Sequence, residues 1–337
     1  MTRERSLTTG RPRLRRRESN ALVAASLAIV SLTASGCVVV HGEREVLPAA
    51  TRAEATKAVR QFTTAYNKAD AAYDGSLDAE HTTGALGAID AARLKAGRVN
   101  NPDGNPQHTP LVLTDVRYTI PKKAGWPRWF VADAQANKGG DARWLLVFTR
   151  NALADPWQAA YLTLVAPGAL PEFTKDKDGW AEAVPADSAG LTRPPEELSE
   201  DYATYLQNGG GTFADGTYTS ELRSARAKNS SKPGLATQYI DEALTSGDFA
   251  PLALRTTDGG ALVFFTTHHF VKQTAAAGAT VPTPNENVRA LTTGEITQSL
   301  TMEFVANEVA LDPAKGSGDG QVSLLSRLEG LTAAKGE

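Results

Sequence analysis

The chain has 337 residues, of which 41% are hydrophobic and 22% charged, and its formal net charge is −3. This balance is typical of a globular protein and excludes the collagen-like and low-complexity classes. A single cysteine excludes an internal disulfide and the zinc and iron–sulfur sites that need several thiolates. The length favours about two domains of roughly 150 residues each.

The first 36 residues have the pattern of an export signal. Seven arginines lie within residues 3–17, and residues 21–34 form an uncharged run of small apolar side chains. A run of about 14 residues is shorter than the roughly 20 that span a bilayer and suits a secretory signal peptide. We expect residues 1–36 to be removed after export. The general secretory route and the twin-arginine route, with Arg16 and Arg17 as the pair, both stay open.

The only cysteine follows this run directly, in the sequence Ala34-Ser35-Gly36-Cys37. This sequence resembles the bacterial lipobox, although Ala34 replaces the commoner leucine. The resemblance implies cleavage between Gly36 and Cys37 and a diacylglyceryl group, with palmitate chains, on the Cys37 sulfur. Burial of acyl chains contributes about 0.8 kcal/mol per methylene, so two chains hold a protein firmly. We expect a lipoprotein anchored to the cell membrane on its extracytoplasmic face.

Removal of the signal makes the protein more acidic. Of the 35 basic and 38 acidic residues, 28 and 36 remain after residue 36, which gives a formal charge of −8. Nucleic-acid binding requires a basic face that neutralises phosphates, so this class of partner is not expected. We assign residues 37–52 as a tether between the lipid and the folded body.

Residues 53–166 predict a first α+β module. Ala55, Val59 and Phe62 follow helical spacing, and Thr51 with Glu54 forms a potential capping box before them. Asp74-Gly75 ends this helix, and a second helix and four strands follow. The expected ranges are helices at 53–72 and 83–94, a loop at 100–106, and strands at 111–120, 129–136, 142–151 and 157–165. Helices followed by an antiparallel meander are an α+β order.

Residues 167–195 are rich in Pro, Gly, Asp and Lys and are predicted to be a linker. Residues 196–337 repeat the order of helices followed by strands, which predicts a second α+β module. The expected helices are 195–208, 220–227 and 235–244, and the expected strands are 251–255, 261–273, 288–293, 297–311 and 322–333, the last of which could also be a helix. Two short matches between the halves share an offset of 141 residues, Asp74-Gly75 with Asp215-Gly216 and Pro110 with Pro251, and favour a diverged duplication.

The order of elements resembles the cone-shaped NTF2-like and cystatin-like folds, in which helices pack on a curved antiparallel sheet. The lipobox and the Ala-, Thr- and Gly-rich composition resemble an uncharacterised family of actinobacterial secreted lipoproteins. That resemblance implies a location and assigns no activity.

Histidines and tryptophans are the candidate ligand-lining residues. His268 and His269 lie inside a predicted strand, where neighbouring side chains point to opposite faces, so they do not form one metal site. All five tryptophans lie between residues 126 and 180, and three of them, Trp129, Trp144 and Trp157, fall on or beside neighbouring strands. They predict either ordinary core or the lining of an apolar or carbohydrate-binding face.

We find no nucleophile elbow, Walker loop, zinc-protease motif or complete calcium loop. We therefore expect no metal or cofactor, and a non-enzymatic protein that binds an envelope protein or a small apolar ligand. Two alternatives stay open. One is a hydrolase or isomerase that uses His268 or His269 as general base in a cone-shaped pocket, and the other is a structural spacer.

Overall fold

The first long helix, α1 (Arg52–Ala72), begins at a capping box in the computed structural model, which describes residues 45–318 and 320–337. The Thr51 hydroxyl accepts a hydrogen bond from the Glu54 amide at 3.1 Å, and the Glu54 carboxylate accepts one from the Thr51 amide at 2.8 Å. Tyr73 ends the helix in a left-handed conformation with φ 50°. The predicted helix and its capping box are confirmed, as is the helix that follows, α2 (Gly84–Asn100), which continues past the expected end.

A four-stranded antiparallel sheet follows, and the predicted meander is confirmed. Its strands pair in the order β2-β4-β5-β6. They are β2 (Leu113–Thr119), β4 (Arg128–Ala136), β5 (Arg143–Arg150) and β6 (Gln158–Val165). The last three strands are nearly continuous apolar runs, as expected for strands that are buried on both faces.

The second, larger sheet contains ten strands. Eight of them pair in the order β1-β3-β7-β10-β11-β13-β14-β12, and β9 pairs with β11 beside β10. The bounds are β1 (Leu47–Pro48), β3 (Pro121–Lys123), β7 (Ala181–Val184), β8 (Ser231–Lys232), β9 (Leu235–Leu244), β10 (Leu252–Arg255), β11 (Ala261–Ala275), β12 (Thr292–Thr293), β13 (Ser299–Asp312) and β14 (Ser323–Gly336). The long hairpins of β11 with β13 and of β13 with β14 form its centre.

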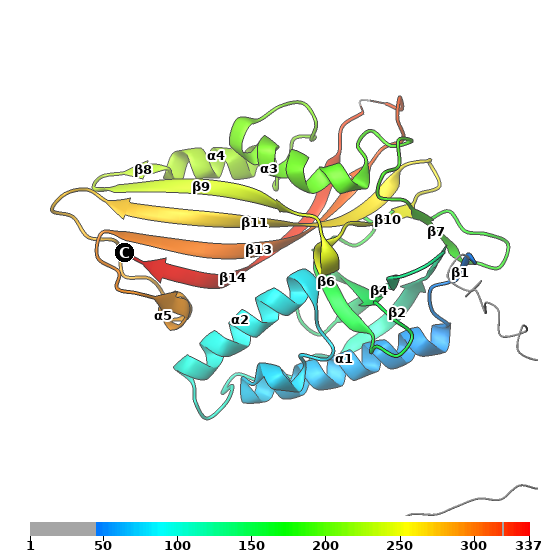
Figure 1. The fold of residues 1–337 in the computed structure, drawn as a ribbon, viewed down its shortest axis with the longest axis horizontal. Coiled ribbons are helices and arrows are strands. Elements are labelled where there is room, and N and C mark those ends of the chain that lie inside the picture. The colour runs from blue at the N-terminus through cyan, green and yellow to red at the C-terminus, as the bar shows by residue number, and fades with distance from the viewer. Residues whose placement is uncertain (1–44, 319) are drawn as a thin grey trace, which may run out of the picture. The chain divides into compact units, whose positions relative to one another are not determined.

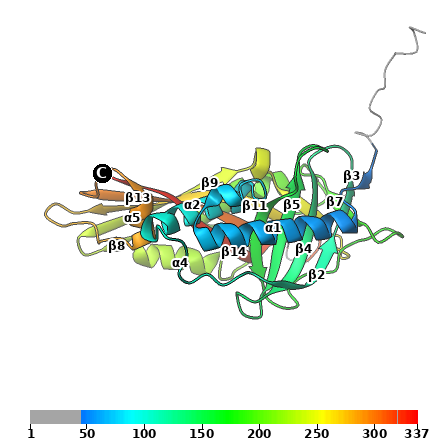
Figure 2. The ribbon, with the colours of Figure 1, turned by 90° about the horizontal axis from the view of Figure 1, so that it is seen from below.

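Three further helices belong to the second half of the chain, α3 (Leu198–Asn208), α4 (Ser220–Asn229) and α5 (Glu286–Leu291). Short 3-10 turns occur at Gly75–Leu77, Pro195–Glu197 and Gly247–Phe249. Figure 1 shows α3 and α4 on one face of the large sheet, and α1 and α2 on the side of the small sheet. Figure 2, from below, shows α1 lying across the strands of the small sheet.

The side chains pack in layers from α1 through both sheets to α3. Phe62 of α1 packs on Phe130 and Phe148, which belong to one face of the small sheet. Trp129 and Tyr161, on its opposite face, join the core that the two sheets share. On the far face of the large sheet, α3 covers a third core, which includes Tyr202, Val263, Phe265 and Phe213. The structure is therefore α+β, as predicted.

Residues 235–244 were expected to form a helix, and this prediction is wrong. They form β9, whose ten residues pair with Thr266–Ala275 of β11. Along β9, buried and half-buried residues alternate with exposed ones, as in a strand with one covered face. The apolar residues of this segment also suit helical spacing, and pairing with the long edge of β11 decides between the two structures.

The strand expected at 288–293 is largely a helix. Asn285 caps α5 by accepting a hydrogen bond from the Val288 amide at 3.0 Å, and Val288 and Leu291 are buried. Only Thr292–Thr293 is extended, as β12. The side-chain cap outweighs the β-branched residues that suggested a strand. At the C-terminus, β14 is a strand rather than the alternative helix.

The predicted linker, residues 167–195, is part of the large sheet. Within it, β7 pairs in parallel with β3 from the first half and antiparallel with β10 from the second half. Residues 45–318 and 320–337 accordingly belong to one compact unit, so the linker does not separate two bodies. Each half does place two helices before an antiparallel meander, and their origin by duplication stays a prediction.

The predicted tether is shorter than expected, because β1 pairs with β3 at residues 47–48 and α1 begins at Arg52. The signal peptide predicted at 1–36, the cleavage site at Gly36 and Cys37, and the first part of the tether lie outside the described residues.

Candidate functional site

The structure does not gather the three candidate tryptophans around one cavity. Trp129 lies in the core between the sheets, whereas Trp144 and Trp157 lie in the core beneath α1. Each of the three residues is at most 8% exposed. Strands β4, β5 and β6 are buried on both faces, so these three side chains fill the core. Of the two interpretations offered by the sequence, ordinary core and the lining of a ligand-binding face, the first therefore describes them better.

His268 and His269 lie on opposite faces of β11. His268 is half-buried and lies within 4 Å of the carboxylates of Glu242 and Glu303. His269 is 3% exposed, and its ring stacks on Phe304 at 4.8 Å between ring centres. Within the described residues, no group of three His, Cys, Asp or Glu side chains is placed to hold a metal ion.

His269 belongs to a buried network of charged side chains. The Arg327 guanidinium donates to its Nδ1 at 3.1 Å, and its Nε2 lies 3.2 Å from the Glu329 carboxylate. Burial, together with the cations Arg327 and Arg226, lowers the pKa of His269 to about 2. The imidazole is therefore neutral, with its proton on Nε2 directed at Glu329.

Glu308 completes this network on β13. Its Oε1 accepts a hydrogen bond from the Thr267 hydroxyl at 2.7 Å and lies 3.4 Å from Arg327 Nε. Its Oε2 is buried and has no hydrogen-bond partner among the described residues. Burial raises the pKa of Glu308 to about 8, so the group holds its proton near neutral pH.

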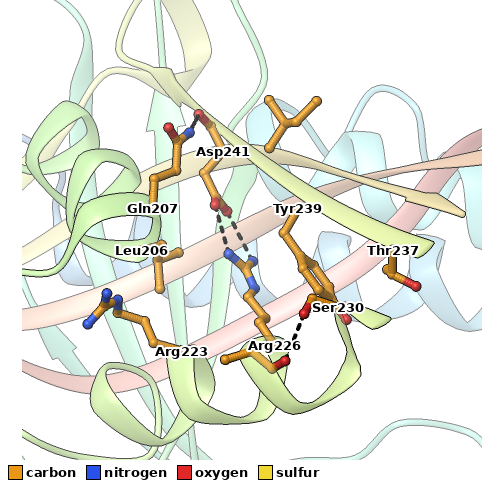
Figure 3. Close-up of a pocket in the computed structure, with 10 residues that line it drawn as sticks. Leu206, Gln207, Arg223, Arg226, Ser230, Thr237, Tyr239 and Asp241 are labelled. Carbon is orange, nitrogen blue, oxygen red and sulfur yellow. Dashed lines mark hydrogen bonds and ion pairs between the residues drawn. The ribbon is translucent and has the colours of Figure 1, made fainter. Parts of the chain in front are cut away.

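A hollow of about 440 Å³ opens beside this network, between α3, α4 and β9 (Figure 3). Asp241 of β9 lies in its wall and is the direct cross-strand neighbour of His269. Arg226 of α4 forms a two-point ion pair with Asp241, with N–O distances of 2.7 and 3.0 Å. The Gln207 side chain donates to the Asp241 carbonyl at 2.9 Å. The lining residues are Leu206, Gln207, Arg223, Arg226, Ala227, Ser230, Thr237, Tyr239, Ile240 and Asp241.

The two arginines of the hollow have different surroundings. Arg226 is buried, and its charge is balanced by Asp241, with the Tyr239 ring 5.1 Å from the guanidinium carbon. Arg223 has no carboxylate within 4 Å among the described residues. Its guanidinium lies 5.4 Å from the centre of the Tyr205 ring. Within the part of the chain that the structure describes, the hollow thus holds one cation without an ionic partner.

Gly209 determines where the Arg223 guanidinium can lie. This glycine follows α3 with φ 77°, and a Cβ there would come within 2.8 Å of Arg223 Nη1. A side chain at residue 209 would therefore both strain the backbone and displace the guanidinium.

The sequence did not indicate these residues as a site. Arg223 and Arg226 are three residues apart on α4, a spacing that brings side chains to one face of a helix. Asp241, however, joins them only because residues 235–244 form a strand, and the prediction of a helix there concealed the site.

A buried ion pair, an arginine without an ionic partner among the described residues, and several hydroxyl and amide groups around a hollow make this a candidate polar site on an α+β protein. The chain belongs to the family described as a domain of unknown function (DUF8094), whose model matches residues 46–336. Within the described residues, no helix is long and apolar enough to cross a bilayer.

Several curated proteins are similar to this chain over most of its length. An uncharacterized lipoprotein of Streptomyces coelicolor is 71% identical over 328 residues, 97% of this chain and 98% of its own. An uncharacterized lipoprotein of Streptomyces avermitilis is 62% identical over 317 residues, 94% and 95% of the two chains. A second S. coelicolor protein of that description is 28% identical over 66% of this chain and 63% of its own.

These relatives confirm the resemblance to uncharacterised actinobacterial lipoproteins. No solved structure matches the chain, and the expected likeness to NTF2-like or cystatin-like folds is therefore not confirmed.

Proposed function

We propose that this protein is a lipid-anchored binding protein of the extracytoplasmic face of the cell membrane, and that the hollow between α3, α4 and β9 binds an acidic group. The observation that carries the proposal is Arg223, a cation in the wall of the hollow without a carboxylate within 4 Å among the described residues. Arginine presents several donors in a planar fork that suits carboxylate and phosphate groups.

The charge of the hollow favours an anion of modest size. Its charged lining residues are Arg223, Arg226 and Asp241, which leaves one positive charge. The volume of about 440 Å³ lies within the range of small-molecule sites. Ser230 and Thr237 add hydroxyl groups to the same wall. The sequence suggested a small apolar ligand, whereas the charge of the hollow favours a small acidic one.

The lipid anchor is supported by the lipobox at Cys37 and by the names of the relatives. Cell fractionation tests it. The native protein should sediment with membranes. Cys37→Ser lacks the thiol that carries the acyl chains, so its form without the signal peptide should not sediment with membranes. Acyl-free protein in the membranes of wild-type cells would contradict the anchor.

Ligand binding is tested by titrating the purified lipoprotein with inorganic phosphate and with small dicarboxylates in a calorimeter. A charge-assisted hydrogen bond contributes about 1.5–3 kcal/mol, so Arg223→Gln should weaken binding about tenfold or more. Lys228→Gln is the matched control, because Lys228 is exposed on the same helix and does not line the hollow. Equal affinity of Arg223→Gln and the native protein would sink the assignment of the site.

The proposal assigns binding rather than catalysis. Neither His268 nor His269 lines the hollow, and burial beside two arginines lowers the pKa of His269 to about 2, far from the value that suits a general base near neutral pH. The alternative of a hydrolase or isomerase with a histidine base is therefore not adopted.

A further inference from the structure

A second hollow lies where the chain enters the folded body. This groove has a volume of about 460 Å³ and is formed by the residue before β1, by β3, β7 and the start of β10 with the segment before it, and by Trp129 of β4. Among the described residues, its charged lining residues are two lysines, and the other lining residues are apolar. They are Val46, Lys122, Lys123, Ala124, Pro127, Trp129, Ala183, Val184, Pro185, Ala186, Ala250, Pro251, Leu252 and Ala253.

The start of the folded chain is fixed beside this groove. The Ala49 amide donates to the Pro121 carbonyl at 2.9 Å, and the Arg128 guanidinium donates to the Leu47 carbonyl at 3.1 Å. Val46, directly before this attachment, lines the groove and is 60% exposed. A large apolar side chain therefore stays in contact with solvent at the point where the tether begins.

The short tether limits how far this groove can lie from a lipid anchor. Val46 is nine residues after Cys37. A fully extended chain covers at most about 3.3–3.6 Å per residue, so Val46 lies within about 30 Å of the anchored sulfur. The surface beside β1 is therefore held within this distance of the anchored sulfur.

The chemistry of the groove suits a phospholipid. Apolar side chains form most of its lining, which favours an acyl chain. Lys122 is paired with Asp176 and Asp178, whereas Lys123 donates to the Pro127 carbonyl at 2.8 Å and has no ionic partner among the described residues, so Lys123 is the cation left to attract a phosphate headgroup. Among the described residues no carboxylate lines the groove itself, and the nearest to its lysines are Asp176 and Asp178, which pair with Lys122. The anchor needs both of its own chains in the bilayer for firm attachment, so the groove is left for a neighbouring lipid.

We infer that the β1–β3–β7 end of the body faces the membrane and that this groove takes up an acyl chain of a phospholipid from the supporting leaflet. The inference rests on the lipid anchor proposed above. It is independent of the acidic ligand, because the two hollows share no residue.

Photo-crosslinking tests the groove on the complete lipoprotein. The protein is reconstituted into nanodiscs whose phospholipid carries a diazirine on one acyl chain, and crosslinked peptides are mapped by mass spectrometry after illumination. We expect label on the peptides that contain Val46 and Ala186. The turn around Ala277, beyond β11, should stay unlabelled, because it lies at the far end of the large sheet from β1 in Figure 1.

Three single substitutions provide the comparison. Val46→Glu and Ala186→Glu place a carboxylate in the groove at exposed positions, where folding should tolerate it, and should abolish the label. Ala277→Glu, also exposed, should leave the label unchanged. Unlabelled groove peptides in protein that stays on the nanodisc would overturn the inference and leave the anchor intact. Protein that does not associate with nanodiscs at all would instead refute the anchor.

Discussion

Arg226 of α4 and Asp241 of β9 form a buried two-point ion pair, with N–O distances of 2.7 and 3.0 Å. The pair joins a helix to the strand that it covers and forms the wall of the candidate binding hollow. Both side chains are at most 9% exposed, so neither charge has water to replace its partner.

Asp241→Ala should destabilise the protein by about 3–5 kcal/mol, because it leaves the Arg226 guanidinium buried and uncompensated. The double variant Arg226→Met, Asp241→Leu removes both charges and should recover most of the loss. Urea unfolding followed by circular dichroism measures both. A single variant as stable as the native protein would show that the pair is hydrated in solution.

Glu308 should make the protein less stable as the pH rises. Burial raises its pKa to about 8 in the folded state, whereas the unfolded value is near 4.5. Below pH 4.5 both states hold the proton, and between pH 4.5 and 8 only the folded state holds it. The contribution of Glu308 to the free energy of unfolding therefore falls across this window, with a limiting slope of about 1.4 kcal/mol per pH unit. Above pH 6.5 His269 is neutral in both states and does not oppose this slope. Glu308→Gln should remove this slope, and an unchanged pH profile would contradict the assignment.

His269 should have the opposite effect at acid pH. Its pKa is lowered to about 2 by burial and by the cations Arg327 and Arg226, compared with 6.5 unfolded. The unfolded state gains a proton first, so the stability contributed by His269 is present above pH 6.5 and is lost as the pH falls toward 2. Thermal melts between pH 4 and 7 should show His269→Gln gaining stability relative to the native protein as the pH falls, because the variant lacks the His269 contribution that the native protein loses.

Gly209→Ala should weaken ligand binding without any change to a charged residue. The backbone there has φ 77°, and the added Cβ would meet Arg223 Nη1 at 2.8 Å. The strained conformation should cost about 1–3 kcal/mol of stability, and the displaced guanidinium should lower the affinity for phosphate or dicarboxylates. Gly211→Ala is the control, because φ there is not positive and no atom lies within 4 Å of its added Cβ. Equal affinities of Gly209→Ala and Gly211→Ala for these ligands would show that Gly209 does not influence the site.

Local signals in the sequence were sufficient for much of the first half. Thr51 and Glu54 specify the start of α1 through hydrogen bonds between residues three apart, and such contacts depend on the nearby sequence alone. Each of β4, β5 and β6 contains a run of at least four consecutive apolar residues, which indicated strands but not the two cores that cover them.

The second half shows where local signals fail. Residues 235–244 suit a helix by the spacing of their apolar side chains, and the free edge of β11, distant in sequence, draws them into a strand. The same pairing sets Asp241 opposite His269 and within reach of Arg226. The sequence shows that Arg223 and Arg226 share one face of a helix, but it does not show that Asp241 lies beside them.

The lone cysteine, the prediction of an export signal and the α+β class follow from the sequence by itself, because each depends on composition or on neighbouring residues. Tertiary structure alone decided that residues 167–195 join the large sheet and that a strand replaces a helix beside α4. It also decided that one arginine is neutralised while another is left without an ionic partner among the described residues. The physical reason is that backbone pairing and charge balance depend on partners that the fold brings together from distant parts of the chain.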